Sequence, residues 1–116
     1  MYSGIMLLSD SNSQLLSLGG VELANTRRYA DLIDGEACRV QFNASAGISV
    51  RVEFSVDDGA NWSTLVPEDV YTGANPYVSS WQVIPDTAKT TNVLLRGLGI
   101  GTGVLVTVNY VQIEFR

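Results

Sequence analysis

Four acidic residues lie close enough together in this sequence to suggest acid–base chemistry: Asp57 with Asp58, and Glu68 with Asp69. Paired carboxylates hydrolyse glycosides when one acts as the acid and the other as base or nucleophile. The same side chains could hold Ca²⁺ if their loops met. All four occur in predicted turns, however, where acidic residues have a conformational reason to occur. We therefore expect neither a catalytic nor a metal site here.

The rest of the chain lacks the usual catalytic side chains. Its 116 residues include no histidine, the commonest general base and metal ligand, and one cysteine, Cys38. A single cysteine cannot form an intrachain disulfide, and Zn²⁺ would need more thiolates. Cys38 is in phase with Val40 and Phe42, which indicates a buried core position. We expect a protein that is not an enzyme and binds no cofactor.

Charge and hydropathy exclude two further classes of partner. The net charge is −5, and the seven basic residues are scattered along the chain, so we expect binding to neither nucleic acid nor membrane. The apolar patch Ile5 to Leu8 lacks the basic region and the length of a secretion signal or a membrane span. We expect a protein made and retained in the cytoplasm of its host.

Period-two alternation of apolar and polar residues is the clearest structural signal. It is strongest from residue 48 to 56, where Ile48, Val50, Val52, Phe54 and Val56 alternate with polar residues. Alternation recurs in 37–43, 77–83 and 104–115. Residues 62–66 are predicted as the short return strand of a hairpin, and 92–98 as a mostly apolar strand buried on both sides. About seven to eight short strands of this kind predict an all-β fold, an antiparallel β-sandwich or jelly-roll-like domain.

Three segments carry more specific expectations. Residues 25–33 fit a helix or an extended strand about equally well. Gly97, Gly99, Gly101 and Gly103 occupy alternate positions before the last strand and predict a turn. In that last strand the apolar phase changes, which predicts a bulge near Tyr110 and Val111.

The hairpin after residue 54 contains a recognisable turn motif. Ser55-Val56-Asp57-Asp58-Gly59-Ala60-Asn61-Trp62 resembles the Asp-box, the S-x-D-x-G-x-x-W turn of sialidase repeats and several unrelated β proteins. The resemblance implies that Asp57 bonds the turn's own backbone, Gly59 takes a positive φ, and Trp62 packs beneath the hairpin. Sialidases repeat the box around a propeller, whereas this chain has one copy. We therefore carry over the structural turn formed by Ser55, Asp57, Gly59 and Trp62, and not the activity.

Residues 1–14 have the composition of an N-terminal arm, followed by a single β-sandwich domain at 15–116. The apolar residues of this arm must pack either on their own domain or on a neighbouring subunit. Trp62 and Trp81 follow the phase of their strands and are predicted to be core residues, whereas Tyr71 and Tyr77 flank a Gly and a Pro and are predicted to be exposed. The predicted partner contacts are Ile5, Met6, Leu7, Leu8, Tyr71 and Tyr77.

In general character the chain is similar to small β-sandwich accessory proteins of bacteriophage virions, such as capsid decoration (cement) proteins or tail components. The resemblance implies a virion location, a homo-oligomer and a major capsid or other virion protein as partner. Its arm and loops would bridge neighbouring subunits. The alternative is a carbohydrate-binding module or receptor-binding tip that uses Tyr71, Tyr77 or an exposed Trp to bind a glycan.

Overall fold

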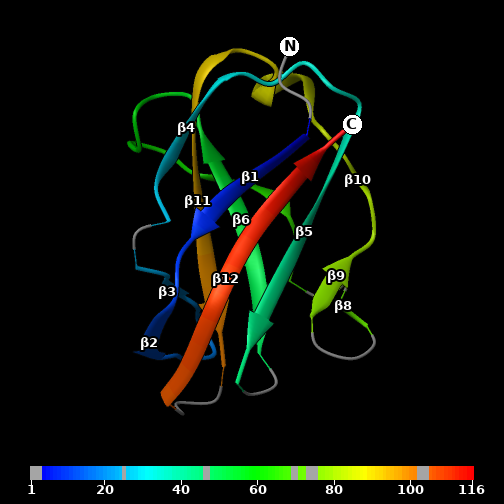
Figure 1. Cartoon of the computed structure of the whole chain (residues 1–116). Helices are drawn as coiled ribbons and strands as arrows, with labels where there is room; N and C mark the ends of the chain where they lie inside the picture. Colours follow the sequence, from blue (N-terminus) through cyan, green and yellow to red (C-terminus); the bar gives the residue numbers. More distant parts are fainter. Residues whose placement is uncertain (1–3, 25, 46–47, 69–70, 73–75, 102–104) are drawn as a thin grey trace.

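The structure is a computed structural model. It describes residues 4–24, 26–45, 48–68, 71–72, 76–101 and 105–116, except for the side chains of residues 32, 71 and 72. The described residues form two antiparallel sheets that pack face to face as a sandwich (Figure 1). The predicted fold class is confirmed.

We name each sheet after its long C-terminal strand. The β12 sheet has seven strands: β1 (Gly4–Ser9), β2 (Asn12–Leu15), β5 (Ala37–Ala44), β8 (Tyr71–Thr72), β9 (Tyr77–Ser79), β10 (Gln82–Val83) and β12 (Leu105–Phe115). The β11 sheet has five strands: β3 (Val21–Glu22), β4 (Arg28–Leu32), β6 (Ser49–Ser55), β7 (Ser63–Val66) and β11 (Thr91–Ile100). One turn of 3₁₀-helix, η1 (Asp86–Ala88), precedes β11. In the described residues, no helix is long and apolar enough to cross a membrane.

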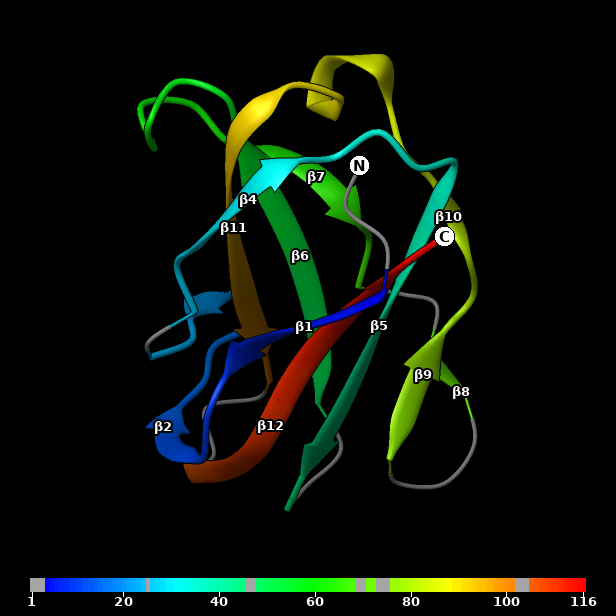
Figure 2. The same ribbon diagram turned by 45° about the horizontal axis from the view of Figure 1, so that its top comes forward.

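In three places, two consecutive short strands pair with the same long strand. β1 and β2 both pair with β12, β3 and β4 both pair with β11, and β9 and β10 both pair with β5. If each such pair is taken as one interrupted strand and the two-residue strand β8, which pairs with β9 at the end of the β12 sheet, is set aside, the described chain has eight main strands. They are ordered 1-8-3-6 in the β12 sheet and 2-7-4-5 in the β11 sheet. This is the double-sheet jelly-roll arrangement. Figure 2 shows the β12 sheet crossing in front of β6 and β11.

Inward-facing residues of both sheets form the core. Strand β5 buries Cys38, Val40 and Phe42, in the alternation expected of a strand with one wet face. Cys38 is fully buried, as predicted. The largest fully buried side chains are Phe42, Leu8, Leu16, Leu23, Ile33, Ile84, Leu95 and Ile113, followed by four valines.

The segment predicted as an arm needs correction. Residues 4–9 and 12–15 are strands β1 and β2, both paired with β12, so they belong to the sandwich. Even the polar run between them is held in place, because Ser9 donates to the carbonyl of Ala24 and the side chain of Asn12 donates to Ser9. The linker-like composition reflects a turn between two edge strands.

The glycine run also differs from its prediction as a turn. Gly97 and Gly99 lie inside β11, and Gly101 follows its last residue, while Gly103 lies outside the described residues. A β-carbon at Gly99 would lie 2.8 Å from Leu23 Cδ2 and 3.0 Å from Leu16 Cδ2. Gly99 therefore makes space for these two buried leucines on the inner face of β11.

The structure also tests the predictions for residues 25–33, for the bulge in the last strand and for the strand at 77–83. Residues 28–32 form β4, so the extended alternative is the observed one. The register of β12 against β5 shifts between Val108 and Tyr110, so the bulge lies immediately before the predicted pair Tyr110 and Val111. The predicted strand 77–83 divides into β9 and β10.

Candidate functional site

The turn after β6 is built around the carboxylate of Asp57. Its Oδ1 accepts hydrogen bonds from the Ser55 hydroxyl (2.6 Å) and the Asn61 backbone N–H (2.9 Å), and its Oδ2 accepts from the Asn61 amide (2.7 Å). The Ser55 hydroxyl oxygen in turn accepts from the backbone N–H of Gly59 (2.8 Å). These hydrogen bonds, led by the one from Ser55, lower the pKa of Asp57 to about 2.

Gly59 has the backbone geometry that the motif requires, with a φ of +90°. Trp62 is only half-buried and lies outside the core, contrary to its prediction as a core residue. The Arg96 guanidinium carbon lies 4.0 Å from its ring centre and that of Arg27 lies 5.3 Å away. Arginine side chains thus provide the partners that apolar residues would provide in a core.

These arginines belong to a charged network on the outer face of the β11 sheet. Arg96 contacts Glu53 directly across the strand pair at 2.7 Å, and Arg51 lies 3.2 Å from the other oxygen of Glu53. Arg27 binds Glu22 at 2.6 Å, which lowers the pKa of Glu22 and raises that of Arg27. Glu53 is buried, so its position between two guanidinium groups offsets its loss of hydration.

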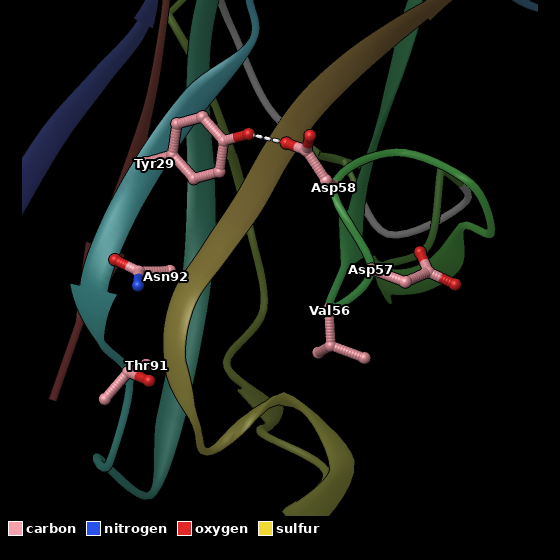
Figure 3. Close-up of a pocket in the computed structure, with 6 residues that line it drawn as sticks. All are labelled: Tyr29, Val56, Asp57, Asp58, Thr91 and Asn92. Carbon is pink, nitrogen blue, oxygen red and sulfur yellow. Dashed lines mark hydrogen bonds between the residues drawn. The ribbon is translucent and has the colours of Figure 1, made fainter.

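A hollow of about 600 Å³ lies beside the turn (Figure 3). It is lined by Tyr29 of β4, by Val56, Asp57 and Asp58 of the turn, and by Thr91 and Asn92 at the start of β11. The Tyr29 hydroxyl donates to Asp58 Oδ1 across the hollow, whereas Figure 3 shows Asp57 pointing away from Tyr29. Asp58 and Asn92 are the non-glycine residues with positive φ in the described part of the chain, at 59° and 57°.

Of the four carboxylates considered for catalysis or Ca²⁺, the three that the structure describes have separate partners. Asp57 serves the turn, Asp58 accepts from Tyr29, and Glu68 lies 3.4 Å from Arg51, while Asp69 lies outside the described residues. Among the residues that the structure describes, no group of three or more acidic, cysteine or histidine side chains could hold a metal ion.

The predicted partner contacts of the first strand separate onto two faces. Leu8 is fully buried and Met6 packs against the core, whereas Ile5 and Leu7 are 58% and 43% exposed. Ile5 pairs with Glu114 and Leu7 with Gln112, so both side chains lie on the outer face of the β12 sheet. Alternation along a strand accounts for the separation.

Two further leucines continue this exposed apolar series, and they were not singled out in the sequence. Leu15 of β2 and Leu105 of β12 pair directly and are 64% and 67% exposed. The sequence signal was present in the outward phase of each strand, but it could be recognised only once β2 was known to be a strand. We call Ile5, Leu7, Leu15 and Leu105 the outer apolar series.

The predicted tyrosine contacts and the second tryptophan are placed as follows. Tyr77 is half-buried, and its ring centre lies 5.2 Å from that of Phe42, so it is less exposed than predicted. The side chain of Tyr71 is outside the described residues. Trp81 is half-buried beneath two guanidinium groups, those of Arg39 (4.4 Å) and Arg116 (4.1 Å), and is likewise not a core residue.

Comparisons with known proteins extend the description of the fold. A scan against protein-family models found no match, and a search of curated proteins also found none. Among solved structures, the chain is similar to the crystal structure of the infectious bursal disease virus VP2 subviral particle, with a TM-score of 0.53 and 15% sequence identity. The match covers 94% of this chain and 31% of that one. The match therefore shows a shared β fold, and the chain spans about a third of the length of the matched protein.

Proposed function

We propose that this chain is a non-enzymatic structural protein of a virus particle, which decorates or cements a bacteriophage capsid or forms part of the tail. The observation that carries this proposal is the outer apolar series along β12. Four large apolar side chains point to solvent from one sheet, where they would favour burial against a partner.

The jelly-roll order of the strands supports the proposal. The fold is shared, over almost the whole chain, with a viral protein whose structure is that of a subviral particle. Jelly-roll sandwiches recur in viral capsid domains. The carboxylates support the non-enzymatic part, because Asp57 and Glu68 are engaged by neighbouring groups.

Strand β1 is well suited to contact another subunit. It is the terminal strand in the order of the β12 sheet, and residues 4–9 carry no charged side chain. Neutral edge strands with exposed apolar side chains pair readily with other chains. In our proposal the partner is a major capsid or other virion protein, and copies of this chain associate with one another on the particle.

Immunogold electron microscopy tests the location. Antibodies raised against the recombinant chain should label intact virus particles purified from a sample in which the gene for this chain is present. Label on the shell supports decoration, label on the tail supports a tail component, and particles without label argue against the proposed function.

A paired substitution tests the contact surface. Ile5→Ser with Leu7→Ser should abolish co-sedimentation of the recombinant chain with particles, while circular dichroism shows that the fold is retained. Val83→Ser is the matched control, since Val83 is 83% exposed on the short strand β10 of the same sheet. Equal co-sedimentation of the double variant and the control would contradict the role of the outer apolar series.

A further inference from the structure

The hollow beside the turn offers a binding site of defined chemistry. From Tyr29, Val56, Asp58, Thr91 and Asn92, we infer that it binds a neutral saccharide. This inference stands independently of the proposed virion role. The volume of about 600 Å³ lies in the range of small-molecule sites.

Tyr29 provides the apolar surface. Its side chain is 53% exposed, and its hydroxyl is fixed by Asp58, so the ring is held in place before any ligand arrives. Val56, also 53% exposed, adds a second apolar surface from the opposite side of the hollow. The C–H face of a pyranose ring would cover such surfaces and remove them from water.

Polar groups around the ring remain available for hydroxyl groups. The Tyr29 hydroxyl donates to Oδ1 of Asp58, and no donor in the described part of the chain forms a hydrogen bond with Oδ2. The Thr91 hydroxyl and the Asn92 amide likewise make no hydrogen bond within the described residues. A carboxylate accepts strongly from hydroxyl groups, while an amide both donates and accepts.

Asn92 supplies a separate argument. Its φ of 57° is a conformation that glycine adopts more easily, yet the position carries an amide that makes no hydrogen bond to the described protein. Strained residues of this kind gather at ligand-binding sites. Asp58, with a φ of 59°, faces the same hollow.

The charges of the lining residues select the class of saccharide. Among the described residues that line the hollow, two are carboxylates and none is cationic, so an acidic sugar or a phosphate would be repelled. Asp57 contributes to this charge, but its oxygens are already engaged by the turn. A neutral hexose is the ligand that these groups fit.

The test is an NMR titration of the ¹⁵N-labelled full chain with the methyl glycosides of glucose, galactose and mannose, in EDTA. At least one glycoside should produce saturable shifts at residues 29, 58 and 92, with a Kd on the order of 1 mM. Tyr29→Ala should weaken this binding about tenfold or more. Asn92→Gly permits the left-handed backbone, removes the side chain that carries the amide, and should weaken binding severalfold.

Tyr110→Ala, on the outer face of the other sheet, is the matched aromatic control and should bind as the parent chain does. Choline serves as a comparison, because an acidic hollow with one aromatic ring could instead hold an organic cation. The inference is overturned by the absence of saturable shifts with all three glycosides, by equal binding to Tyr29→Ala, or by tighter binding of choline than of any glycoside.

Discussion

The guanidinium group of Arg96 stacks on the Trp62 ring at 4.0 Å while it donates hydrogen bonds to Glu53. The turn of residues 55–62 is therefore joined to the middle of β11 by a cation–π contact. Gly59 lies beside this contact with a φ of +90°, a backbone conformation that residues with a side chain rarely adopt. The motif packs onto a charged sheet face rather than into the core.

Trp62→Ala should lower the free energy of unfolding by roughly 1–3 kcal/mol, because it removes both apolar contact area and the partner of two guanidinium groups. Trp62→Phe should recover part of this loss, since phenylalanine keeps an aromatic face. Urea denaturation measures both changes. Val83→Ala, at an exposed position, should shift stability by no more than about 0.5 kcal/mol. An unchanged urea midpoint for Trp62→Ala would show that the stacking does not stabilise the fold.

Asp57 should stabilise the fold in a pH-dependent manner. Its pKa falls from 3.8 to about 2 on folding, so the contribution is fully present above pH 3.8 and is lost as the pH falls towards 2. Asp57→Asn should therefore be less stable than the parent chain at neutral pH, and the difference should narrow over this acidic range. Thermal unfolding at a series of pH values measures it. Asp31→Asn is the control at an exposed carboxylate, and a difference that stays constant down to pH 2 would contradict the role of the Asp57 charge.

Cys38 should be chemically inert in the folded protein. It is fully buried, and desolvation raises the pKa of its thiol to about 12, so almost no thiolate forms at neutral pH. Labelling with a thiol reagent, followed by mass spectrometry, should show modification only after denaturation. Rapid labelling of the native chain would mean that β5 opens locally or that the thiol is accessible.

The predictable part of the fold is the part in which one strand face is buried and the other is wet. Strands β5 and β6 show this alternation cleanly in sequence, and the sandwich follows from several such strands. β4 was ambiguous because Tyr29, Leu32 and Ile33 also fit a helical spacing. The strands within residues 4–15 are not evident in the sequence, because β1 and β2 are short edge strands with a polar turn between them and only their pairing with β12 identifies them.

The candidate sites were less predictable because they depend on neighbours that are distant in sequence. Alternation wrongly predicts Trp62 and Trp81 as core residues, because each lies just outside the strand whose phase it was expected to follow. The pattern also could not show that arginines distant in sequence would cover both rings. The hollow likewise combines Tyr29, Asp58 and Asn92 from three separate segments. The local motif defined the turn, whereas the surface beside it arises from the strand order.

The glycines of β11 allow a matched test of packing. Gly99→Ala would place a β-carbon 2.8 Å from Leu23 Cδ2, and the leucine must move to admit it. We expect a loss of about 1–3 kcal/mol, the usual cost of overpacking a core. Gly97→Ala is the control, because its β-carbon would have its nearest contact at 3.6 Å, an ordinary van der Waals distance. Urea denaturation should show a much smaller effect for Gly97→Ala than for Gly99→Ala.

A double-mutant cycle with Leu23 separates overpacking from a change in strand propensity. Leu23→Ala alone should destabilise the fold by roughly 2–5 kcal/mol, because it empties part of the core. In the double variant the new β-carbon at residue 99 occupies space that the leucine has left, so the combined loss should be smaller than the sum of the two single losses. Strict additivity would contradict the steric explanation, since a purely local effect at residue 99 would not depend on Leu23.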